Sequence, residues 1–376
     1  MRPVPRARPR GIALLMALTV VMLLTYFMSE FFFATGLELR GMTTFKDSQQ
    51  ARMLAKSVFK ATQVAMLQDE VNFFKGYDQL AKLLQVAAVP WNNGLLVGLQ
   101  VTPQDPLFNL NQNAGTRPGT TQERERRQIF LQTLERLQVP VQGTPEATSP
   151  LPVETIEGLY AALYDWTDAD SDEYLEFPAV RGAEADAYLG LPVPYDVKNA
   201  PLDRLTEIRL VRGVAKSGIP WAMWEATVTA LPPVSGADSG FTERIDVNVA
   251  SHEHIATFLA TRLEDPNVIG GDEDIINGIA PYAQSADQLA DFFAPADGQR
   301  QTYDPDSLQQ ALESQGFTGN YGKSYLFSTI NQYYRIRIVT EVAGVRARLE
   351  AMLNIPRDPK TRTAKGTPKI LWETVN

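Results

Sequence analysis

The densest group of carboxylates in the chain lies in the segment DWTDADSDEYLEF, residues 165–177. Asp168, Asp170 and Asp172 alternate with other residues there, and the segment also holds Asp165, Glu173 and Glu176. Hard cations such as calcium take several oxygen ligands, which short and closely spaced side chains can supply. The pattern therefore favours either a cation site or a solvated acidic loop, which is the commoner outcome for an acidic run.

This segment is not an EF-hand loop, although its alternating aspartates mimic the first half of one. Glu173 stands where that loop requires glycine, and Ala179 stands where it requires glutamate. Glu184 and Asp186, in the segment GAEADAY, would complete a cation site from the start of the next element. A second acidic group, residues 272–274, fits a solvated loop better than a site.

The remaining reactive side chains give no catalytic pattern. His252 and His254 flank Glu253 at what reads as a helix start, and positions two apart on a helix point apart, so a shared zinc is not expected. The chain has no cysteine, which excludes disulfides, thiolate metal sites and thiol nucleophiles. The common nucleophile, zinc-protease and phosphate-loop motifs are missing too. A catalytic pair of carboxylates remains possible, because any two of the 44 acidic residues could meet in the fold, but the sequence singles out no such pair.

Composition restricts the class of partner. The 376 residues carry a net charge of −9, and removing four arginines near the N-terminus takes it to −13: Arg2, Arg6, Arg8 and Arg10. An acidic body of this kind disfavours nucleic acid, whose phosphates need a basic face. Apolar residues make up 44%, enough for packed cores, and the length suggests two folding units plus an N-terminal segment.

The N-terminus combines a short basic leader, ending at Gly11, with an uncharged apolar run over residues 12–28. A secretory signal peptide would need small residues at its cleavage site. Residues 34–36 fit this requirement poorly, because three bulky phenylalanines precede them. A single-span anchor is a second interpretation. The third is a prepilin signal, cut after Gly11 so that Ile12 becomes the N-terminus, and the segment resembles this type. The run continues into an amphipathic pattern that predicts one helix over about residues 12–70.

Most pilin-like proteins carry a glutamate at the fifth mature position, where it is thought to pair with the N-terminal amine of a neighbouring subunit. The corresponding residue here is Met16. A buried carboxylate without that partner would be costly, and a subunit that lacks the carboxylate need not dock beneath another. Met16 therefore favours a position at the end of a fibre.

Downstream, hydrophobic periodicity and turn residues predict a mixed succession of elements. Helices are expected over residues 77–86, 123–139, 155–166, 253–263 and 287–294, with a further helical segment around 200–212. Strands are expected over 95–103, within 324–355 and over 370–375, while 221–232 looks extended and 140–154 reads as a proline-rich connector. A mostly helical middle between strands suits an α+β fold.

Several segments, taken in order, resemble the K-type minor pseudopilins of bacterial type II secretion systems. The matching segments are the leader with RGIALLMALTVV, LELRGMTTFKDSQQARMLA, PLFNLNQ, ALYDWTDADSDE, GAEADAY, PYDVKNAPLDRLTEIRLVRGV, IDVNVAS and FSTINQYYRIRIVTEV. Met16 agrees with that family, which also lacks the fifth-position glutamate. The chain departs from the family pattern at Ala185, where aspartate is usual, and at Val249.

The resemblance implies an α+β, type IV pilin-like fold in which a long N-terminal helix packs on a small antiparallel sheet that carries a large, mostly helical insertion. The implied divisions are a leader (1–11), the N-terminal helix (12–70), a pilin-like domain (71–112 and 321–376) and the insertion (113–320). Calcium is expected in the insertion. Its implied ligands are Asp165, Asp168, Asp170, Glu184 and Asp186.

The resemblance also implies a role: a non-enzymatic minor pseudopilin at the tip of the pseudopilus, which helps to initiate assembly for protein export across the outer membrane. The chain would cross the bacterial inner membrane once, with its C-terminal body in the periplasm. Implied partners are the I- and J-type minor pseudopilins, the major pseudopilin and the prepilin peptidase, and not nucleic acid. A minor pilin of a type IV pilus and a membrane-anchored periplasmic hydrolase are the alternatives.

Overall fold

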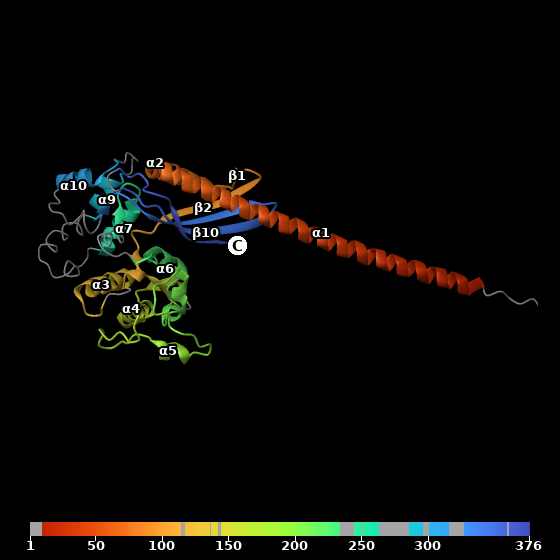
Figure 1. The fold of residues 1–376 in the computed structure, drawn as a ribbon, viewed down its shortest axis with the longest axis horizontal. Helices are drawn as coiled ribbons and strands as arrows, with labels where there is room; N and C mark the ends of the chain where they lie inside the picture. The colour runs from red at the N-terminus through yellow and green to blue at the C-terminus, as the bar shows by residue number, and fades with distance from the viewer. Residues whose placement is uncertain are drawn as a thin grey trace, which may run out of the picture.

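The computed structural model describes residues 10–113, 117–135, 137–141, 144–233, 244–250, 252–262, 286–295, 301–315, 327–358 and 361–376. One long helix, α1 (Arg10–Gln68), leads into a globular body (Figure 1). Its 59 residues make it about 90 Å long at the usual rise per residue. This confirms the single helix predicted over residues 12–70, and α1 is long and apolar enough to cross a membrane.

A five-stranded antiparallel sheet receives the C-terminal half of α1. Its spatial order is β1-β2-β9-β10-β11, formed by β1 (Val89–Trp91), β2 (Gly94–Pro103), β9 (Tyr333–Val342), β10 (Val345–Asn354) and β11 (Lys369–Val375). The β9–β10 hairpin turns through Ala343 and Gly344, with φ angles of 49° and 83°, a left-handed backbone that glycine adopts without strain. The strands predicted over 95–103, within 324–355 and over 370–375 are confirmed.

The sheet and the helix share one apolar core. Ala55, Val58 and Phe59 of α1 are almost fully buried, and they belong to the same cluster as Ile336 and Ile338 of β9. A second helix, α2 (Glu70–Val86), starts earlier than the predicted residues 77–86. Its N-cap is Asp69, whose carboxylate accepts a hydrogen bond from the Asn72 amide at 3.0 Å.

The helical insertion lies between β2 and β9. The chain leaves the sheet after Pro103 and returns to it at Tyr333. The insertion therefore starts earlier and ends later in the sequence than the predicted residues 113–320. Its first part packs around α4 and contains β3 (Phe108–Asn109), η1 (Leu110–Asn113), α3 (Thr121–Glu135), β4 (Val139–Val141), β5 (Thr144–Ser149), α4 (Val153–Thr167), α5 (Ala185–Leu189), η2 (Leu205–Leu210), η3 (Val214–Lys216), α6 (Trp221–Thr227) and β6 (Val228–Thr229).

The second part of the insertion has a core of its own. It contains β7 (Ile245–Asp246), α7 (His252–Arg262), α9 (Ala286–Phe293), α10 (Pro305–Ser314) and β8 (Phe327–Ser328). In Figure 1, α3 to α6 form a lobe beside the sheet, and α9 and α10 lie at the end of the body that is far from the start of α1. The wide end of the molecule is therefore opposite its N-terminus.

Three local predictions differ from the structure. The segment 221–232 was expected to be extended, but it begins with the helix α6. Most residues of α6 are good helix formers, and the helix buries Trp224, which is 1% exposed. The connector at 140–154 contains the antiparallel pair β4–β5, and the helical segment near 200–212 is the 3-10 helix η2.

Two buried ionic groups join the insertion to the pilin-like part. Glu225 of α6 lies 3.0 Å from Arg335 Nη1 and also accepts hydrogen bonds from Arg337, which in turn bonds Glu350 at 2.9 Å. In the second group, Arg362 Nη2 lies 3.2 Å from Glu70 Oε2 and 3.4 Å from Asp246 Oδ2. Buried charges of this kind need their partners. The Glu225 group therefore fixes the α3–α6 lobe against the sheet, and the Arg362 group fixes the second part of the insertion against α2.

Candidate functional site

The acidic segment follows directly after α4, and Asp165 in the last turn of that helix organises it. Asp165 is fully buried, and each of its carboxylate oxygens accepts a backbone N–H: Oδ1 from Tyr174 at 2.9 Å and Oδ2 from Ala183 at 2.6 Å. Gly182 lies beneath the carboxylate, where an added Cβ would be 1.7 Å from Oδ2. Asp165 therefore holds both arms of the loop against the end of α4.

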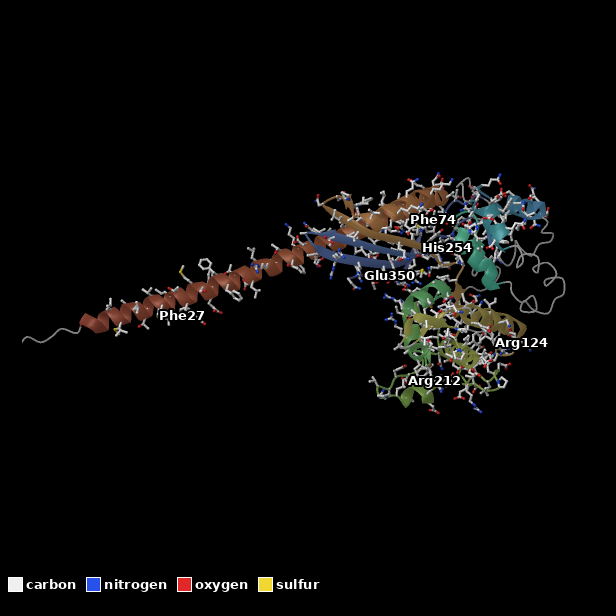
Figure 2. All side chains as sticks on the ribbon, turned by 180° about the vertical axis from the view of Figure 1, so that it is seen from behind. Phe27, Phe74, Arg124, Arg212, His254 and Glu350 are labelled. Atoms are coloured by element: carbon white, nitrogen blue, oxygen red, sulfur yellow. The ribbon has the colours of Figure 1, made fainter. Side chains whose placement is uncertain are left out.

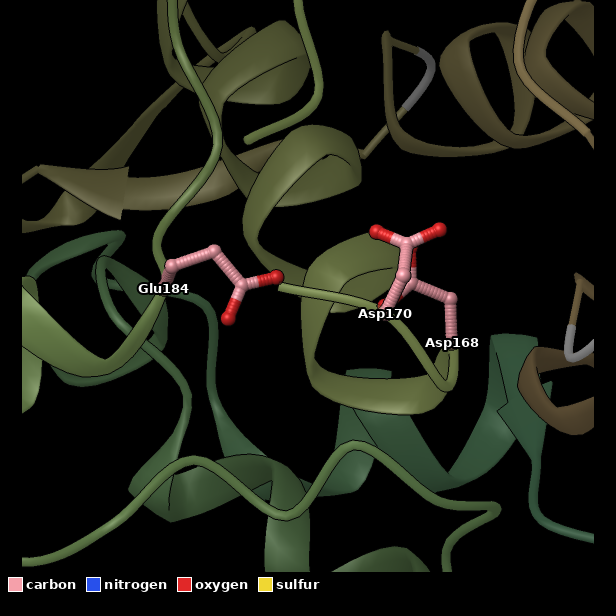
Figure 3. A group of neighbouring side chains, drawn as sticks. All are labelled: Asp168, Asp170 and Glu184. Carbon is pink, nitrogen blue, oxygen red and sulfur yellow. The ribbon is translucent and has the colours of Figure 1, made fainter. Parts of the chain in front are cut away.

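Three acids come together at the mouth of this loop. Asp168, Asp170 and Glu184 each offer an oxygen, and these oxygens all lie within 4.8 Å of one another. Figure 3 shows Glu184 on one side and the two aspartates at the end of α4 on the other. Asp168 caps the C-terminus of α4, whereas Glu184 precedes α5. Among the residues that the structure describes, no other group of acids or histidines has this geometry.

Several oxygen atoms of this group are buried without a hydrogen-bond donor. Oδ1 of Asp168 and both carboxylate oxygens of Glu184 are buried and have no hydrogen bond of good geometry, and the two residues are only 5% and 7% exposed. Oδ1 of Asn199 is in the same state, while the Asn199 amide donates to the carbonyl of Asp170. The Asn199 side chain and the Ala185 amide lie near the Glu184 carboxylate and partly offset the effect of burial on its pKa. Unpaired buried oxygens are costly, and a hard cation with oxygen ligands would satisfy them.

The electrostatics of the group agree with this interpretation. Burial, and then the negative charge of Asp170, raise the pKa of Asp168 to about 8. Burial is also the main reason why the pKa of Glu184 is raised. Carboxylates crowded in this way hold protons when nothing else compensates their charge, and a divalent cation would replace those protons. The donor set therefore fits calcium, with the remaining ligands supplied by water or backbone carbonyls.

The structure brings together three of the five predicted ligands and places the other two outside the group. It brings Asp168, Asp170 and Glu184 together, gives both oxygens of Asp165 to backbone amides, and leaves Asp186 exposed in the first turn of α5 outside the group. Asn199 was not predicted, because it is distant in sequence. Its φ angle of 46° lies in the left-handed region that asparagine tolerates, a weak signal for a turn residue.

The other predicted positions are accounted for as follows. His252 Nε2 lies 2.9 Å from Asp291 Oδ1, so its described partner is a carboxylate on α9. Residues 272–274 and the leader arginines at positions 2, 6 and 8 lie outside the described residues. Gly11 and Ile12 fall within the first turn of α1, and Met16 is 67% exposed on the same helix.

The N-terminal half of α1 is a second functional surface. Its large apolar side chains from Leu14 to Phe45 are all more than half exposed, and Figure 2 shows Phe27 among side chains that project freely from the helix. An apolar helix of this length cannot stay exposed in water. Its length and apolar composition fit a helix that crosses a membrane once.

The chain is similar in sequence to known proteins. The family model described as "Type II secretion system (T2SS), protein K" matches residues 107–233, which is the part of the insertion that packs around α4. The type II secretion system protein K of Pectobacterium carotovorum subsp. carotovorum is 28% identical over 215 residues, 56% of this chain and 60% of that protein. The protein K of Aeromonas hydrophila is 25% identical over 363 residues, 94% of this chain and 95% of that protein.

One solved structure also aligns with most of the chain. It is a chain in the crystal structure of the GspK–GspI–GspJ complex from the type 2 secretion system of enterotoxigenic Escherichia coli. The two share 18% identity with a TM-score of 0.48, and the alignment covers 88% of this chain and 98% of that one.

Proposed function

We propose that this chain, a homologue of the protein K of type II secretion systems, is the minor pseudopilin at the tip of a pseudopilus and helps to start its assembly. The resemblance drawn from the sequence is confirmed by the family model and by both relatives. One observation carries the proposal: an exposed apolar half-helix runs without a break into a pilin-like sheet whose insertion matches the K family over residues 107–233.

Two features support a place at the tip. Met16 would be the fifth residue of a chain cut after Gly11, and its thioether cannot pair with the amine of a neighbouring subunit as a carboxylate would. The insertion also makes the far end of the body much wider than α1 (Figure 1). A subunit with a broad end and no docking carboxylate fits the end of a fibre better than its shaft.

The proposed setting follows from the same helix. α1 would cross the inner membrane once, with the body in the periplasm, and would later pack against the helices of other pseudopilins. The proposed partners are the I- and J-type minor pseudopilins, the major pseudopilin and the prepilin peptidase. The role is structural rather than catalytic, since Asp165 is engaged with backbone amides and the remaining acids of the group suit a cation.

We also propose that calcium binds at Asp168, Asp170 and Glu184, with Asn199 as a further ligand. The support is the closeness of the three carboxylates and the buried, unpaired oxygens of Asp168, Glu184 and Asn199. A bound cation would join the end of α4 to the start of α5 and to the segment that carries Asn199. Its role would be to stiffen the lobe, because a site absent from the unfolded chain adds its binding free energy to folding.

N-terminal sequencing of the mature protein, isolated from membranes of cells with the prepilin peptidase, tests the proposed role. Ile12 should be the first residue, and a Gly11→Val variant should keep its leader. Gly36→Ala is the matched control, because a Cβ there meets nothing within 4 Å. A mature protein that starts at Met1 or between residues 35 and 37 would overturn the proposal.

Co-purification provides the second test. The chain, expressed with I- and J-type minor pseudopilins from the same organism, should elute with both of them in detergent. If it binds neither of them, but does bind the minor pilins of a type IV pilus, the alternative role applies.

A further inference from the structure

A basic pocket lies on the lobe, apart from the cation site. It has a volume of about 250 Å³ and is bounded by the first half of α4, the segment Val180–Arg181 and the turn Arg212–Ser217. Its floor is apolar and is formed by Gly158, Leu159, Ala162 and Val180. The pocket therefore pairs an apolar base with a polar rim, which suits a ligand that has both characters.

The rim carries three cations and one acid. Arg181, Arg212 and Lys216 line it together with Glu154. Within the described part of the chain, Arg212 and Lys216 form no ion pair, and the pair of Arg181 with Glu173 is long, at 3.7 Å, and 75% exposed on the arginine side. These positive charges stand out on a chain whose net charge is −9. They are available to an anionic partner.

The turn that presents two of these cations is well fixed. Gly213 has a φ of 89°, in the left-handed region, and its carbonyl accepts the amides of Lys216 at 3.0 Å and Ser217 at 2.9 Å. Arg212 Nη1 lies 3.4 Å from the carbonyl of Gly182. Val211 and Val214 are buried beneath the turn. A rigid turn places charges at lower entropic cost than a flexible loop.

We propose that this pocket binds an acidic peptide segment of a partner protein. A small apolar side chain of the segment would contact Leu159 and Ala162, while flanking carboxylates would meet Arg212 and Lys216. The place of the pocket disfavours a lipid headgroup, because Arg212 lies on the side of the lobe that is turned away from the sheet, far from the apolar half of α1 (Figure 2). The guanidinium group also pairs with a carboxylate in a planar, two-point geometry.

Fluorescence anisotropy of a labelled peptide tests the proposal. The probe is the fluorescein-labelled peptide Gly-Glu-Leu-Asp-Glu-Gly, titrated with the full mature chain in dodecyl maltoside. The neutral peptide Gly-Gln-Leu-Asn-Gln-Gly should bind at least about tenfold more weakly, as should the acidic peptide to the variant Arg212→Gln with Lys216→Gln. Raising the salt from about 50 to about 300 mM should weaken binding too.

The matched control is Arg348→Gln, which removes one exposed positive charge from β10 and should leave the affinity unchanged. Should the double variant fail to fold, as judged by its melting curve, the exposed Lys216→Gln alone replaces it. Equal binding of the neutral peptide, or full affinity in a folded variant, would overturn the proposal. So would displacement of the peptide by phosphatidylglycerol added in mixed micelles with the same detergent, which would assign the pocket to a lipid. None of these results bears on the pseudopilin role.

Discussion

The carboxylate of Asp165 fills the space that a side chain at position 182 would need. An added Cβ on Gly182 would lie 1.7 Å from Asp165 Oδ2 and 2.8 Å from the amide nitrogen of Tyr174. Asp165 in turn bonds Tyr174 and Ala183, so the aspartate and the glycine form one unit. The acidic loop owes its shape to this pair before any cation binds.

Gly182→Ala should therefore disrupt the loop. Either Asp165 or the strand-like segment beneath it must move, which breaks hydrogen bonds to a buried carboxylate, and we expect the free energy of unfolding to fall by about 2–4 kcal/mol. Urea denaturation measures this. Gly190→Ala is the control, because its Cβ would lie an ordinary 3.6 Å from the nearest atom and its change should stay within about 0.5 kcal/mol. Equal losses in the two variants would contradict this account.

Calcium should raise the melting temperature of the chain. At a calcium concentration about 100 times the dissociation constant, one site that exists only in the folded chain adds about 2.7 kcal/mol to the free energy of unfolding. Asp168→Asn and Glu184→Gln should remove most of this gain, since each takes away a buried carboxylate of the group.

Asp186→Asn serves as the control for the calcium experiment, because Asp186 lies in the same segment but outside the group. It should respond to calcium as the natural chain does. A calcium response that survives in both Asp168→Asn and Glu184→Gln would show that the ion binds elsewhere. Differential scanning fluorimetry, with the metal chelated and then restored, measures all four proteins.

Glu225→Ala should loosen the lobe from the sheet. It leaves Arg335 and Arg337 without their shared carboxylate, and because Arg337 is one-third exposed we expect a loss of about 1–3 kcal/mol, less than for a fully buried pair. Glu341→Ala breaks the exposed pair with Arg346 on the same sheet, and should cost less than about 1 kcal/mol. If the two variants melt alike, the Glu225 contact does not join the two parts.

The contribution of Glu225 should also depend on pH. Burial opposes its ionisation, but Arg337 and Arg335 outweigh that effect and lower the pKa of Glu225. A carboxylate with a lowered pKa stabilises the fold above the pKa of the unfolded chain, and this stability is lost as the pH falls through the folded value. The difference in unfolding free energy between the natural chain and Glu225→Ala should thus shrink in acid and stay constant from about pH 6 to 8.

Asp105 should show the opposite dependence. It is 1% exposed and accepts the amides of Gln332 and Tyr333, but burial raises its pKa to about 8. Its contribution is therefore complete below about pH 4 and is lost as the pH rises towards 8. Asp105→Asn should be less stable than the natural chain by about 1–3 kcal/mol near pH 5, with a smaller deficit near pH 9. A deficit that grows with pH would contradict the raised pKa.

Elements with strong local signals could be predicted from the sequence, whereas contacts between distant segments could not. Unbroken periodicity predicted α1 almost to its ends, and alternation predicted β9 and β10. Trp221–Thr227 was predicted as extended, although Ala222, Met223, Glu225 and Ala226 are good helix formers. The burial of Trp224 and the contact of Glu225 with β9 could not be inferred from the sequence.

The candidate site divides in the same way. Asp168 and Asp170 follow from their spacing in an acidic run, and Glu184 was proposed from its place at the start of the next element. The hydrogen bonds of Asp165 to Tyr174 and Ala183 could not be inferred from spacing, because they depend on how the loop returns to α4. The place of Asn199 near the acids depends on its left-handed backbone, which brings its side-chain amide to the Asp170 carbonyl. The sequence therefore indicates which side chains could be ligands, and the fold decides which of them lie close together.

The pairing of β2 with β9 sets the order in which the chain can fold. These strands are neighbours along most of their length, from Leu95 opposite Glu341 to Pro103 opposite Tyr334, yet the entire insertion separates them in the sequence. Contacts so distant in sequence close slowly, since the loop entropy is lost before they form. The insertion, with its own local contacts, should therefore be compact before the sheet is complete. Until β9 pairs with it, one edge of β2 stays open beside α1, and at this stage the chain is most exposed to wrong strand pairing.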